Sequence, residues 1–366
     1  MRILVPARPA PLVDSCTIAP MRFAPEPPAP AAHAARTAIL LCNLGTPAAP
    51  TAAAVRPYLA EFLGDQRVVE IPRLLWWPIL HGIILRLRPR ASAEKYRQVW
   101  DQGGASGSPL LHWTQVQVRM LRGWLSHADA GGVLVAAAMR YGSPSIASQL
   151  DALKAQGAQR ILILPLYPQY SCTTTASVCD AVYAWASTQR HIPELRFVQR
   201  YYDHPGYIAA LAASVRAHWQ DHGRAEKLLM SFHGVPLRTR TLGDPYIDEC
   251  HATGQLLAQA LGLSEQDYCI TFQSRFGKAQ WVEPYTQPTV EALARSGTRS
   301  LDVICPGFTS DCIETLEEIN MEVRQAFLEN GGQEYRYIPC LNDRADWITA
   351  LRDIGLQHLQ GWPVQG

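Results

Sequence analysis

Short apolar runs alternate with amphipathic stretches along most of the chain, and this alternation constrains the fold more than any other feature. The apolar runs have the length of buried strands, whereas the stretches between them have helical periodicity. Strands that alternate with helices form βαβ units, so we predict an α/β fold with parallel sheets covered on both faces. The predicted strands are 38–44, 132–139, 160–166, 195–200, 227–232, 268–273, 300–305 and 334–338. The predicted helices are 52–63, 92–102, 108–127, 144–156, 174–189, 204–222, 245–262, 285–296, 311–330 and 345–358.

Two pairs of similar segments occur in the same order, which indicates two related halves. AILLCNLGTP (38–47) is similar to KLLMSFHGVP (227–236), and LKAQGAQRILILPLYP (153–168) is similar to LARSGTRSLDVICPGF (293–308). Glycine and proline are common at strand and helix ends, so the shared order is stronger evidence than either pair alone. We therefore predict two similar, open, doubly wound parallel-sheet domains of Rossmann-like type that face a central cleft. Ligands of such folds bind beyond the carboxyl ends of the strands.

The same features divide the chain into four segments. Residues 1–36 are rich in proline and alanine and lack the periodicity of a core, so we predict a disordered extension, with Met21 as an alternative start. Residues 37–190 form the predicted N-terminal α/β domain, 191–340 the C-terminal α/β domain, and 341–366 a C-terminal helix and tail. A chain of 366 residues is long enough for two domains, each with its own core.

Charge and cysteine usage exclude some classes of protein. The chain has 33 Lys and Arg against 32 Asp and Glu, so no overall field attracts nucleic acid. Its nine cysteines form no C-x-x-C pair and lie mostly in or beside apolar segments. This usage is typical of reduced thiols, so we predict a cytoplasmic protein with no nucleic-acid partner.

One stretch, IPRLLWWPILHGIILRLRP (the apolar segment, residues 71–89), has some features of a membrane helix. A spanning helix needs about 20 consecutive apolar residues, and Pro72, Pro78, His81 and Gly82 interrupt this segment. We expect a core helix that covers the sheet. The alternative is a helix with an exposed apolar face, at a membrane surface or over a flat ligand.

The predicted strand in KLLMSFHGVP ends on a histidine, His233. Its position fits two interpretations equally: a packed core histidine with a hydrogen-bond partner, or a reactive group in the cleft. Gly234 leaves room beside the imidazole, and the matching strand end of the first half carries Leu44 instead. This asymmetry favours a chemical role for His233 as a base or a metal ligand.

A row of carboxylates follows another strand end, in PGFTSDCIETLEEINMEV (306–323). Asp311 is the predicted N-cap of this helix. Glu314, Glu318 and Glu322 (the acidic ridge) recur every four residues and drift by only about 40° per step on a 3.6-residue helix. Acids at this spacing repel one another, so the ridge either binds a cation or is a face exposed to solvent. For Glu322 alone, we accept the interpretation as a solvent-exposed residue. The predicted place of Glu314 beside the cleft favours metal binding or proton exchange.

Five motifs together resemble the ferrochelatase family, whose members insert ferrous iron into a porphyrin. They are YPQYSCTTTAS, SFHGVP, GDPYIDEC, FQSRFG with a following Trp, and GFTSDCIETLEEI. The resemblance runs from about Ile39 to Asn342. It implies a two-lobed, chelatase-type fold and a lyase of haem synthesis, with Fe²⁺ and a porphyrin, first of all protoporphyrin IX, as substrates.

The resemblance also implies roles for single residues. His233 matches the active-site histidine and Glu314 the acidic residue opposite it, which makes both predicted catalytic residues. Glu318 and Glu322 match carboxylates proposed as an iron path, so the predicted metal ligands are His233, Glu314, Glu318 and Glu322. The apolar segment matches the lip of the pocket mouth. The predicted porphyrin-binding residues are Arg67 (near a propionate), Arg140, Tyr141, Tyr167, Thr173, Trp281 and Leu44.

Two positions depart from other members of that family. Leu44 stands where some bacterial members carry an iron-ligating tyrosine, so that role is absent. Cys172 matches one ligand of the [2Fe–2S] cluster of animal enzymes, but no cysteine follows Cys340. We therefore predict no [2Fe–2S] cluster. The alternative is a cluster that is ligated by cysteines within the chain.

Two other functions remain open from the sequence. One is a cobalt or nickel chelatase that acts on another tetrapyrrole, and the other is a non-catalytic haem or metal carrier. The long first half favours the larger two-lobed enzyme, and the intact motifs favour catalysis. We expect a monomer rather than an oligomer, and peripheral contact with the inner membrane through the apolar segment is an alternative to a wholly cytoplasmic location.

Overall fold

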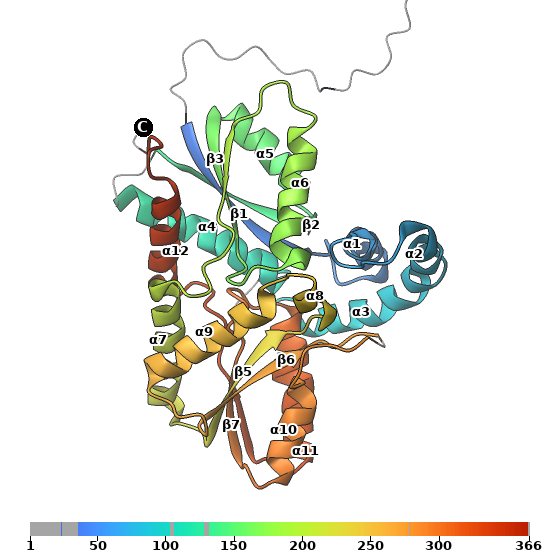
Figure 1. Cartoon of the computed structure of the whole chain (residues 1–366), viewed down its shortest axis with the longest axis vertical. Coiled ribbons are helices and arrows are strands. Elements are labelled where there is room, and N and C mark those ends of the chain that lie inside the picture. The colour runs from blue at the N-terminus through green and yellow to red at the C-terminus, as the bar shows by residue number, and fades with distance from the viewer. Residues whose placement is uncertain (1–22, 24–35, 103–105, 128–131, 278, 365–366) are drawn as a thin grey trace, which may run out of the picture.

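The computed structural model describes residues 23, 36–102, 106–127, 132–277 and 279–364 (Figure 1). The predicted extension therefore lies, apart from Phe23 and Arg36, outside the described residues. Within the described residues, the strands and helices form two stacked α/β halves (Figure 1).

The strands form two parallel sheets of the same topology. The first sheet has the order β2-β1-β3-β4 and the second the order β6-β5-β7-β8, so each strand has a counterpart four strands later. This repeat confirms the predicted pair of similar, doubly wound parallel sheets. The first sheet consists of β1 (Arg36–Thr46), β2 (Leu134–Gly142), β3 (Ala158–Pro165) and β4 (Glu194–Phe197). The second consists of β5 (Lys227–His233), β6 (Tyr268–Gln273), β7 (Ser300–Ile304) and β8 (Glu334–Tyr337).

Helices cover both faces of each sheet, and the sequence missed only short ones. The helices that match predicted stretches are α1 (Ala52–Gly64), α3 (Leu85–Val99), α4 (Pro109–His127), α5 (Ile146–Ala155), α6 (Ser177–Ala186), α7 (Pro205–His222), α9 (Tyr246–Leu261), α10 (Thr286–Arg295), α11 (Arg324–Glu329) and α12 (Ala345–His358). Of the remaining two, α2 (Arg73–Ile79) lies in the apolar segment, where a helix was also expected, and α8 (Arg238–Thr241) lies outside the predicted helices. Three segments are π-helical: η1 (Leu80–Ile84), η2 (Cys172–Ala176) and η3 (Glu314–Val323).

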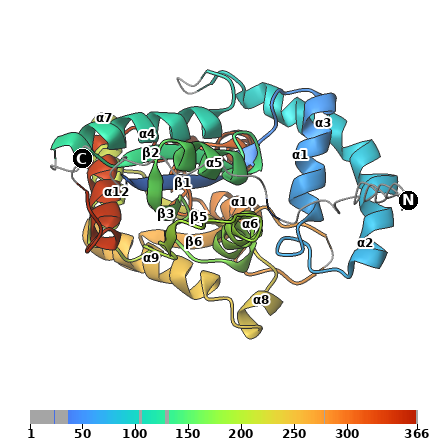
Figure 2. The same cartoon turned by 90° about the horizontal axis from the view of Figure 1, so that it is seen from above.

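Each half has a hydrophobic core of its own, and a further core is shared between the two halves. Alternate residues of a strand face opposite sides of its sheet. In β1, Ile39 and Leu41 face a core that also contains Leu228 and Met230 of β5. Helices α4, α7, α9 and α12 contribute to this shared core, and α12 packs on α7 and α4 (Figures 1 and 2). The C-terminal helix α12 therefore packs against helices of both halves.

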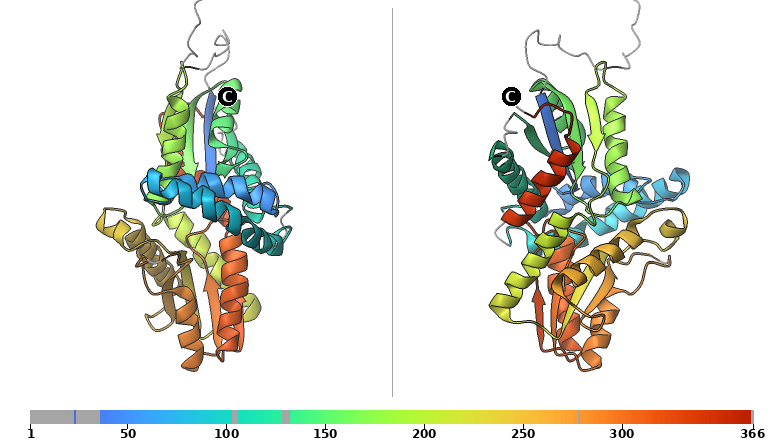
Figure 3. Two further views of the ribbon diagram at one scale, coloured as in Figure 1. Left: turned by 90° about the vertical axis from the view of Figure 1, so that its right-hand side faces the viewer. Right: turned by 60° about the vertical axis from the view of Figure 1, so that its left-hand side comes forward.

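The carboxyl ends of the two sheets meet at this junction. Thr309, in the loop after β7, donates a hydrogen bond to the main-chain oxygen of Leu166, which follows β3 (3.2 Å). Gln117 of α4 donates to the main-chain oxygen of Thr309 (3.1 Å). Helices α1, α2 and α3 project to one side of the sheets at the level of this junction (Figures 2 and 3). Residues of both halves can therefore reach a common site.

The apolar segment 71–89 is not a core helix, so that expectation is wrong. It forms α2, η1 and the first residues of α3. Leu74 is 91% exposed and Leu87 71%, and Leu75, Trp77, Ile79 and Ile83 are also exposed. The segment carries more apolar side chains than its small local core accommodates, which leaves an apolar face open. No helix of the described residues is long and apolar enough to cross a membrane.

Candidate active site

His233 is the last residue of β5 and lies half-buried at the carboxyl end of the second sheet. Its Nδ1 lies 2.7 Å from the main-chain oxygen of Gly234, which directs the other ring nitrogen away from this strand end. A Cβ atom on Gly234 would lie 2.6 Å from the main-chain oxygen of Gln273 and 3.1 Å from the Trp281 ring. Glycine is therefore required for packing against Gln273 and Trp281, whereas the sequence interpretation related it only to space beside the imidazole.

One glutamine connects the strand of His233 to the acidic ridge. Gln273 ends β6 and is the register partner of His233. Its Nε2 donates to the main-chain oxygen of Glu314 at 3.0 Å and to Glu318 Oε2 at 3.3 Å. The structure therefore brings His233, Glu314 and Glu318 to the same end of the second sheet.

The acidic ridge lies on η3, a π-helix rather than the α-helix that the sequence predicts. A π-helix forms i→i+5 hydrogen bonds and has more residues per turn than the 3.6 of an α-helix. Residues four apart therefore still lie on the same face. Glu314 begins η3 and is half-buried near aromatic residues of the first half. Burial first, and then the charge of Glu314, raise the pKa of Tyr58. Burial, Tyr58 and Glu314 likewise raise the pKa of Tyr96. The carboxylate therefore faces across the junction.

The other two ridge carboxylates have partners from different elements. Glu318 accepts hydrogen bonds from the main-chain N–H (2.7 Å) and the hydroxyl of Ser274. Glu322 forms an ion pair with Lys95 Nζ on α3 (2.9 Å). Among the described residues, no group of three or more His, Cys, Asp and Glu side chains is arranged to hold a metal ion. His233, Glu314, Glu318 and Glu322 thus form an open row and not a closed coordination set.

Asp311 is not the N-cap of this helix, so that prediction is wrong. Its buried carboxylate accepts hydrogen bonds from Asn342 (2.7 Å), Tyr337 and Thr315 (3.0 Å). The residue before η3 is Ile313, which has no side-chain cap. Asp311 instead fixes the loop between β7 and η3 to the end of β8 and the segment that follows, because Tyr337, the Cys340 N–H (3.4 Å) and Asn342 donate to it.

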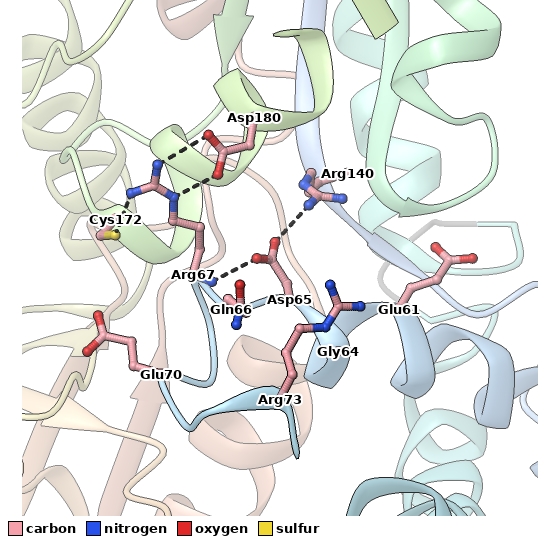
Figure 4. Close-up of a pocket in the computed structure, with 10 residues that line it drawn as sticks. All are labelled: Glu61, Gly64, Asp65, Gln66, Arg67, Glu70, Arg73, Arg140, Cys172 and Asp180. Atoms are coloured by element: carbon pink, nitrogen blue, oxygen red, sulfur yellow. Dashed lines mark hydrogen bonds and ion pairs between the residues drawn. The ribbon is translucent and has the colours of Figure 1, made fainter. Parts of the chain in front are cut away.

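A cavity of about 860 Å³ opens beside α1 and α6 (Figure 4). The predicted porphyrin-binding residues Arg67 and Arg140 line it, but His233 and Glu314 do not. Arg67 points to Asp180, with Nε–Oδ2 and Nη2–Oδ1 distances of 2.7 and 3.2 Å, and its Nη1 lies 3.3 Å from Cys172 Sγ (Figure 4). The lining residues are Glu61, Gly64, Asp65, Gln66, Arg67, Glu70, Arg73, Arg140, Cys172 and Asp180.

Asp65 organises this cavity, and the sequence did not single it out. Its Oδ2 accepts hydrogen bonds from Arg140 Nη2 (2.7 Å), the Tyr141 hydroxyl (2.8 Å) and the Ser177 hydroxyl. Its Oδ1 accepts from the main-chain N–H of Arg67 (2.8 Å). Burial acts to raise the pKa of Asp65, but these hydrogen bonds and the Arg140 charge bring it below its usual range. Asp65 is therefore ionised at neutral pH and fixes both members of the Arg-Tyr pair.

An aromatic cluster (Tyr58, Tyr96 and Tyr141) touches both the cavity and the acidic ridge. All three side chains are buried in one hydrophobic cluster, and the Tyr58 and Tyr96 rings meet edge to face at 6.4 Å. The Tyr141 hydroxyl donates to Asp65 at the cavity, and Ile313, next to Glu314, packs against the same cluster. Leu44, at the end of β1, also packs there.

The loop after β3 holds the remaining predicted residues, Tyr167 and Thr173. Its main chain is fixed by acids of the GDPYIDEC motif, because Cys172 N–H donates to Asp244 (2.7 Å) and Tyr170 N–H donates to Glu249 (2.7 Å). Thr173 lies half-buried in η2. The Tyr167 hydroxyl is buried without a hydrogen-bond partner in the described part of the chain, as is Trp281 Nε1.

Five cysteines are buried in the described part of the chain. Burial raises the pKa of the Cys42, Cys250, Cys305, Cys312 and Cys340 thiols, so these groups are protonated at neutral pH. Cys172 differs because it is half-exposed and contacts Arg67 at the cavity.

Two parallel sheets of the same topology thus meet at their carboxyl ends, with an imidazole, a row of carboxylates and buried aromatic side chains at the junction. These features define an α/β enzyme of the chelatase type. A family model described as Ferrochelatase matches residues 36–359. The ferrochelatase of Polaromonas sp. strain JS666 is 62% identical over 349 residues, which cover 94% of each chain. That of Methylibium petroleiphilum is 60% identical over 345 residues, again 94% of each chain.

Among solved structures, SirB from Bacillus subtilis with Fe³⁺ superposes with a TM-score of 0.49 and 11% identity, over 89% of this chain and 96% of that chain. The chain belongs to the ferrochelatase family. Its activity is the insertion of Fe²⁺ into a porphyrin in haem synthesis, which makes it a lyase. Ferrous iron and a porphyrin are its substrates, and the predicted function is confirmed at this level.

Proposed function

We propose that the porphyrin is protoporphyrin IX, that two pyrrole protons are released, and that His233 and Glu314 act on the reacting centre. The observation that carries this proposal is the connection through Gln273, which pairs with His233 and donates to the main chain of Glu314. It supports an imidazole and a carboxylate at one strand end, where one group takes pyrrole protons and the other holds Fe²⁺.

The macrocycle lies across the apolar side chains between the cavity and the ridge. Leu44, Tyr167 and Trp281 provide that contact, the buried Tyr141 supports Asp65 and Arg140 beside it, and Thr173 lies at its edge. A flat porphyrin hides its nitrogen lone pairs, so binding energy along the ring supports a bent porphyrin with one pyrrole tilted out of plane. The buried, unpartnered hydroxyl of Tyr167 and Nε1 of Trp281 are donors available to the substrate.

The propionates meet the arginines of the cavity. Arg140 donates from Nε to Ser177 and from Nη2 to Asp65. This leaves Nη1 to bind a propionate carboxylate. Arg67 is occupied by Asp180 and Cys172, so a propionate near it shares this cation with Asp180. Charge-assisted pairs of this kind orient the ring more than they strengthen binding in an exposed site.

Iron moves along the acidic ridge as a loosely held substrate. Glu318 and Glu322 are the predicted outer carboxylates, and Glu314 is the inner one. Carboxylates bind Fe²⁺ less tightly than thiolates do, which suits transfer to the ring. The protein carries no [2Fe–2S] cluster in this proposal. It acts as a monomer in the cytoplasm, with peripheral membrane contact through the exposed face of the apolar segment.

The experiment is anaerobic Fe²⁺ insertion into protoporphyrin IX, followed by the absorbance change to haem. We expect His233→Ala and Glu314→Gln to lower kcat by at least about 100-fold. The matched controls, His127→Ala on α4 and Glu329→Gln on α11, change exposed side chains and keep full activity. A folded His233→Ala protein with a near-normal rate would overturn the assignment.

The same assay separates the alternatives. Coproporphyrin in place of protoporphyrin IX tests the choice of porphyrin. Turnover with Co²⁺ or Ni²⁺ but not Fe²⁺ would contradict the iron assignment, and tight haem binding without turnover would identify a carrier.

A further inference from the structure

Lys95 connects the acidic ridge to the helix that follows the apolar segment. Its Nζ lies 2.9 Å from Glu317 Oε1, 3.0 Å from Glu317 Oε2 and 2.9 Å from Glu322 Oε1. Arg88, two helical turns earlier on α3, stacks on the Phe276 ring at 4.3 Å. Residues seven apart share a helix face, so one face of α3 lies along the second half.

The partners of Lys95 differ sharply in burial. The Glu317 side chain is 6% exposed, whereas those of Glu322 and Lys95 are 50% and 44% exposed. Burial raises the pKa of Glu317, the hydrogen bond and charge of Lys95 oppose this shift, and Glu322 adds to it. Within the described residues, Lys95 is the one cation recorded in an ion pair with Glu317. A buried carboxylate needs such a partner, so this pair is a fixed feature and not a transient surface contact.

Glu317 lies on η3 between the ridge residues Glu314 and Glu318. The neighbour of Lys95, Tyr96, is buried close to Glu314, whose charge raises the pKa of Tyr96 together with burial and Tyr58. One turn of α3 therefore contacts η3 through Lys95 and also lies near Glu314 through Tyr96. A shift of this turn would move Glu314 relative to the strand ends.

We propose that Lys95 is a positioning residue for iron insertion, whose ammonium group holds η3 in place through Glu317 and occupies the outer end of the ridge in place of a divalent cation. The positioning part rests on the proposed role of Glu314. The ion pair shares Glu322 with Lys95, so this carboxylate binds an iron ion only weakly and lets it pass on to Glu318.

Metal binding to the porphyrin-free protein tests the second part without reference to catalysis. We expect Lys95→Met to bind Mn²⁺, detected by the loss of its free electron paramagnetic resonance signal, at least tenfold more tightly than the unchanged protein. Lys95→Met with Glu322→Gln returns to the unchanged value. Arg97→Met, which loses only a surface pair with Glu94 on the same helix, is the matched control. Equal Mn²⁺ binding by Lys95→Met and the unchanged protein would overturn the proposal.

Kinetics tests the positioning part. We expect Lys95→Met to lower kcat roughly tenfold at unchanged KM for porphyrin, because a small shift of a catalytic group affects the chemical step first. Lys95→Arg keeps the ion pair and recovers most of kcat. If Lys95→Met folds poorly, Glu317→Gln, which weakens the same ion pair from the η3 side, should lower kcat to a similar extent. Unchanged kcat in Lys95→Met would refute positioning, whereas full activity of Glu314→Gln would refute the proposed function and leave the Mn²⁺ result standing.

Discussion

The Tyr141 hydroxyl lies 2.8 Å from Asp65 Oδ2, the same oxygen that accepts a hydrogen bond from Arg140 Nη2 at 2.7 Å. Two adjacent residues at the end of β2 are therefore oriented by one carboxylate from the loop after α1. Ser177, at the start of α6, donates to the same oxygen. Asp65 thus joins three elements that are distant in sequence and fixes the wall of the cavity.

Replacement of Asp65 by asparagine tests this arrangement. The Asp65 and Arg140 side chains are only 9% and 20% exposed, so Asp65→Asn leaves a largely buried cation without its countercharge. We expect a loss of about 2–3 kcal/mol in the free energy of unfolding, measured by urea denaturation. Asp180→Asn breaks the ion pair with Arg67, whose two side chains are 47% and 42% exposed. This variant should lose less than about 1 kcal/mol in the free energy of unfolding. Similar losses in both variants would contradict a special role for Asp65.

The low pKa of Asp65 predicts a specific pH dependence of stability. A carboxyl group with a folded pKa below its unfolded value stabilises the protein above the unfolded pKa, and this contribution is lost as pH falls through the folded pKa. The unfolded pKa of aspartate is about 3.9. The difference in unfolding free energy between the unchanged protein and Asp65→Asn should therefore be full at pH 7 and shrink below about pH 4. A difference that stays constant down to pH 2.5 would show that Asp65 acts only through packing.

The sequence predicted the sheets well because strand burial is a local property. Apart from β4 and β8 (ELRF and EYRY), each strand of the two sheets carries an apolar run that stands out in its own window. The repeated order of β1 with β5 and of β3 with β7 was visible as similar segments. His233 stood out because it ends a strand, and Glu314 because of the four-residue spacing of the acidic ridge. Their connection through Gln273 was not visible, because it depends on the register of β5 with β6.

Other features depend on contacts that no local pattern encodes. Asp65 has ordinary neighbours in sequence, and only the fold brings Arg140 and Ser177 to it. The π-helical geometry of η3 arises where the helix packs between α3 and α10, so an α-helical period was predicted instead. The core shared by the two halves has no local signature either, because it forms only when α12 packs on α7 and α4.

Gly234→Ala tests the close packing behind His233. The added Cβ atom would lie 2.6 Å from a main-chain oxygen of Gln273, which cannot move without disturbing β6. We expect a loss of about 1–3 kcal/mol in unfolding free energy, the usual range for overpacking, and a lower kcat because His233 shifts. In Gly82→Ala the new Cβ atom meets nothing within 4 Å, so this helical control should be neutral or more stable by about 0.5–1 kcal/mol. Equal stability of the two variants would contradict the close contact.

The exposed face of the apolar segment predicts binding to lipid vesicles. Leu74 and Leu75 are 91% and 64% exposed, and burial of one leucine side chain contributes about 1.5–3 kcal/mol, or roughly tenfold or more in affinity. Leu74→Gln with Leu75→Gln should weaken co-sedimentation with anionic vesicles by at least about tenfold. Leu242→Gln changes a leucine that is 68% exposed after α8 and should have no effect. If the double variant and the control sediment alike, this face does not contact the membrane.

Tyr167→Phe separates a structural from a functional role of a buried hydroxyl. The Tyr167 hydroxyl has no hydrogen-bond partner in the described part of the chain, and a buried, unpaired polar group costs about 1–3 kcal/mol. Its removal should therefore leave the free energy of unfolding unchanged or raise it by about 1 kcal/mol. If the hydroxyl is a donor for the porphyrin, the same variant raises KM for porphyrin several-fold while its KM for Fe²⁺ stays the same. Tyr335→Phe is the control, because that hydroxyl donates to the Ile319 main chain at 2.7 Å and its loss should lower stability instead. A Tyr167→Phe protein that is less stable and has an unchanged KM would show that the hydroxyl has a structural partner and no role in binding.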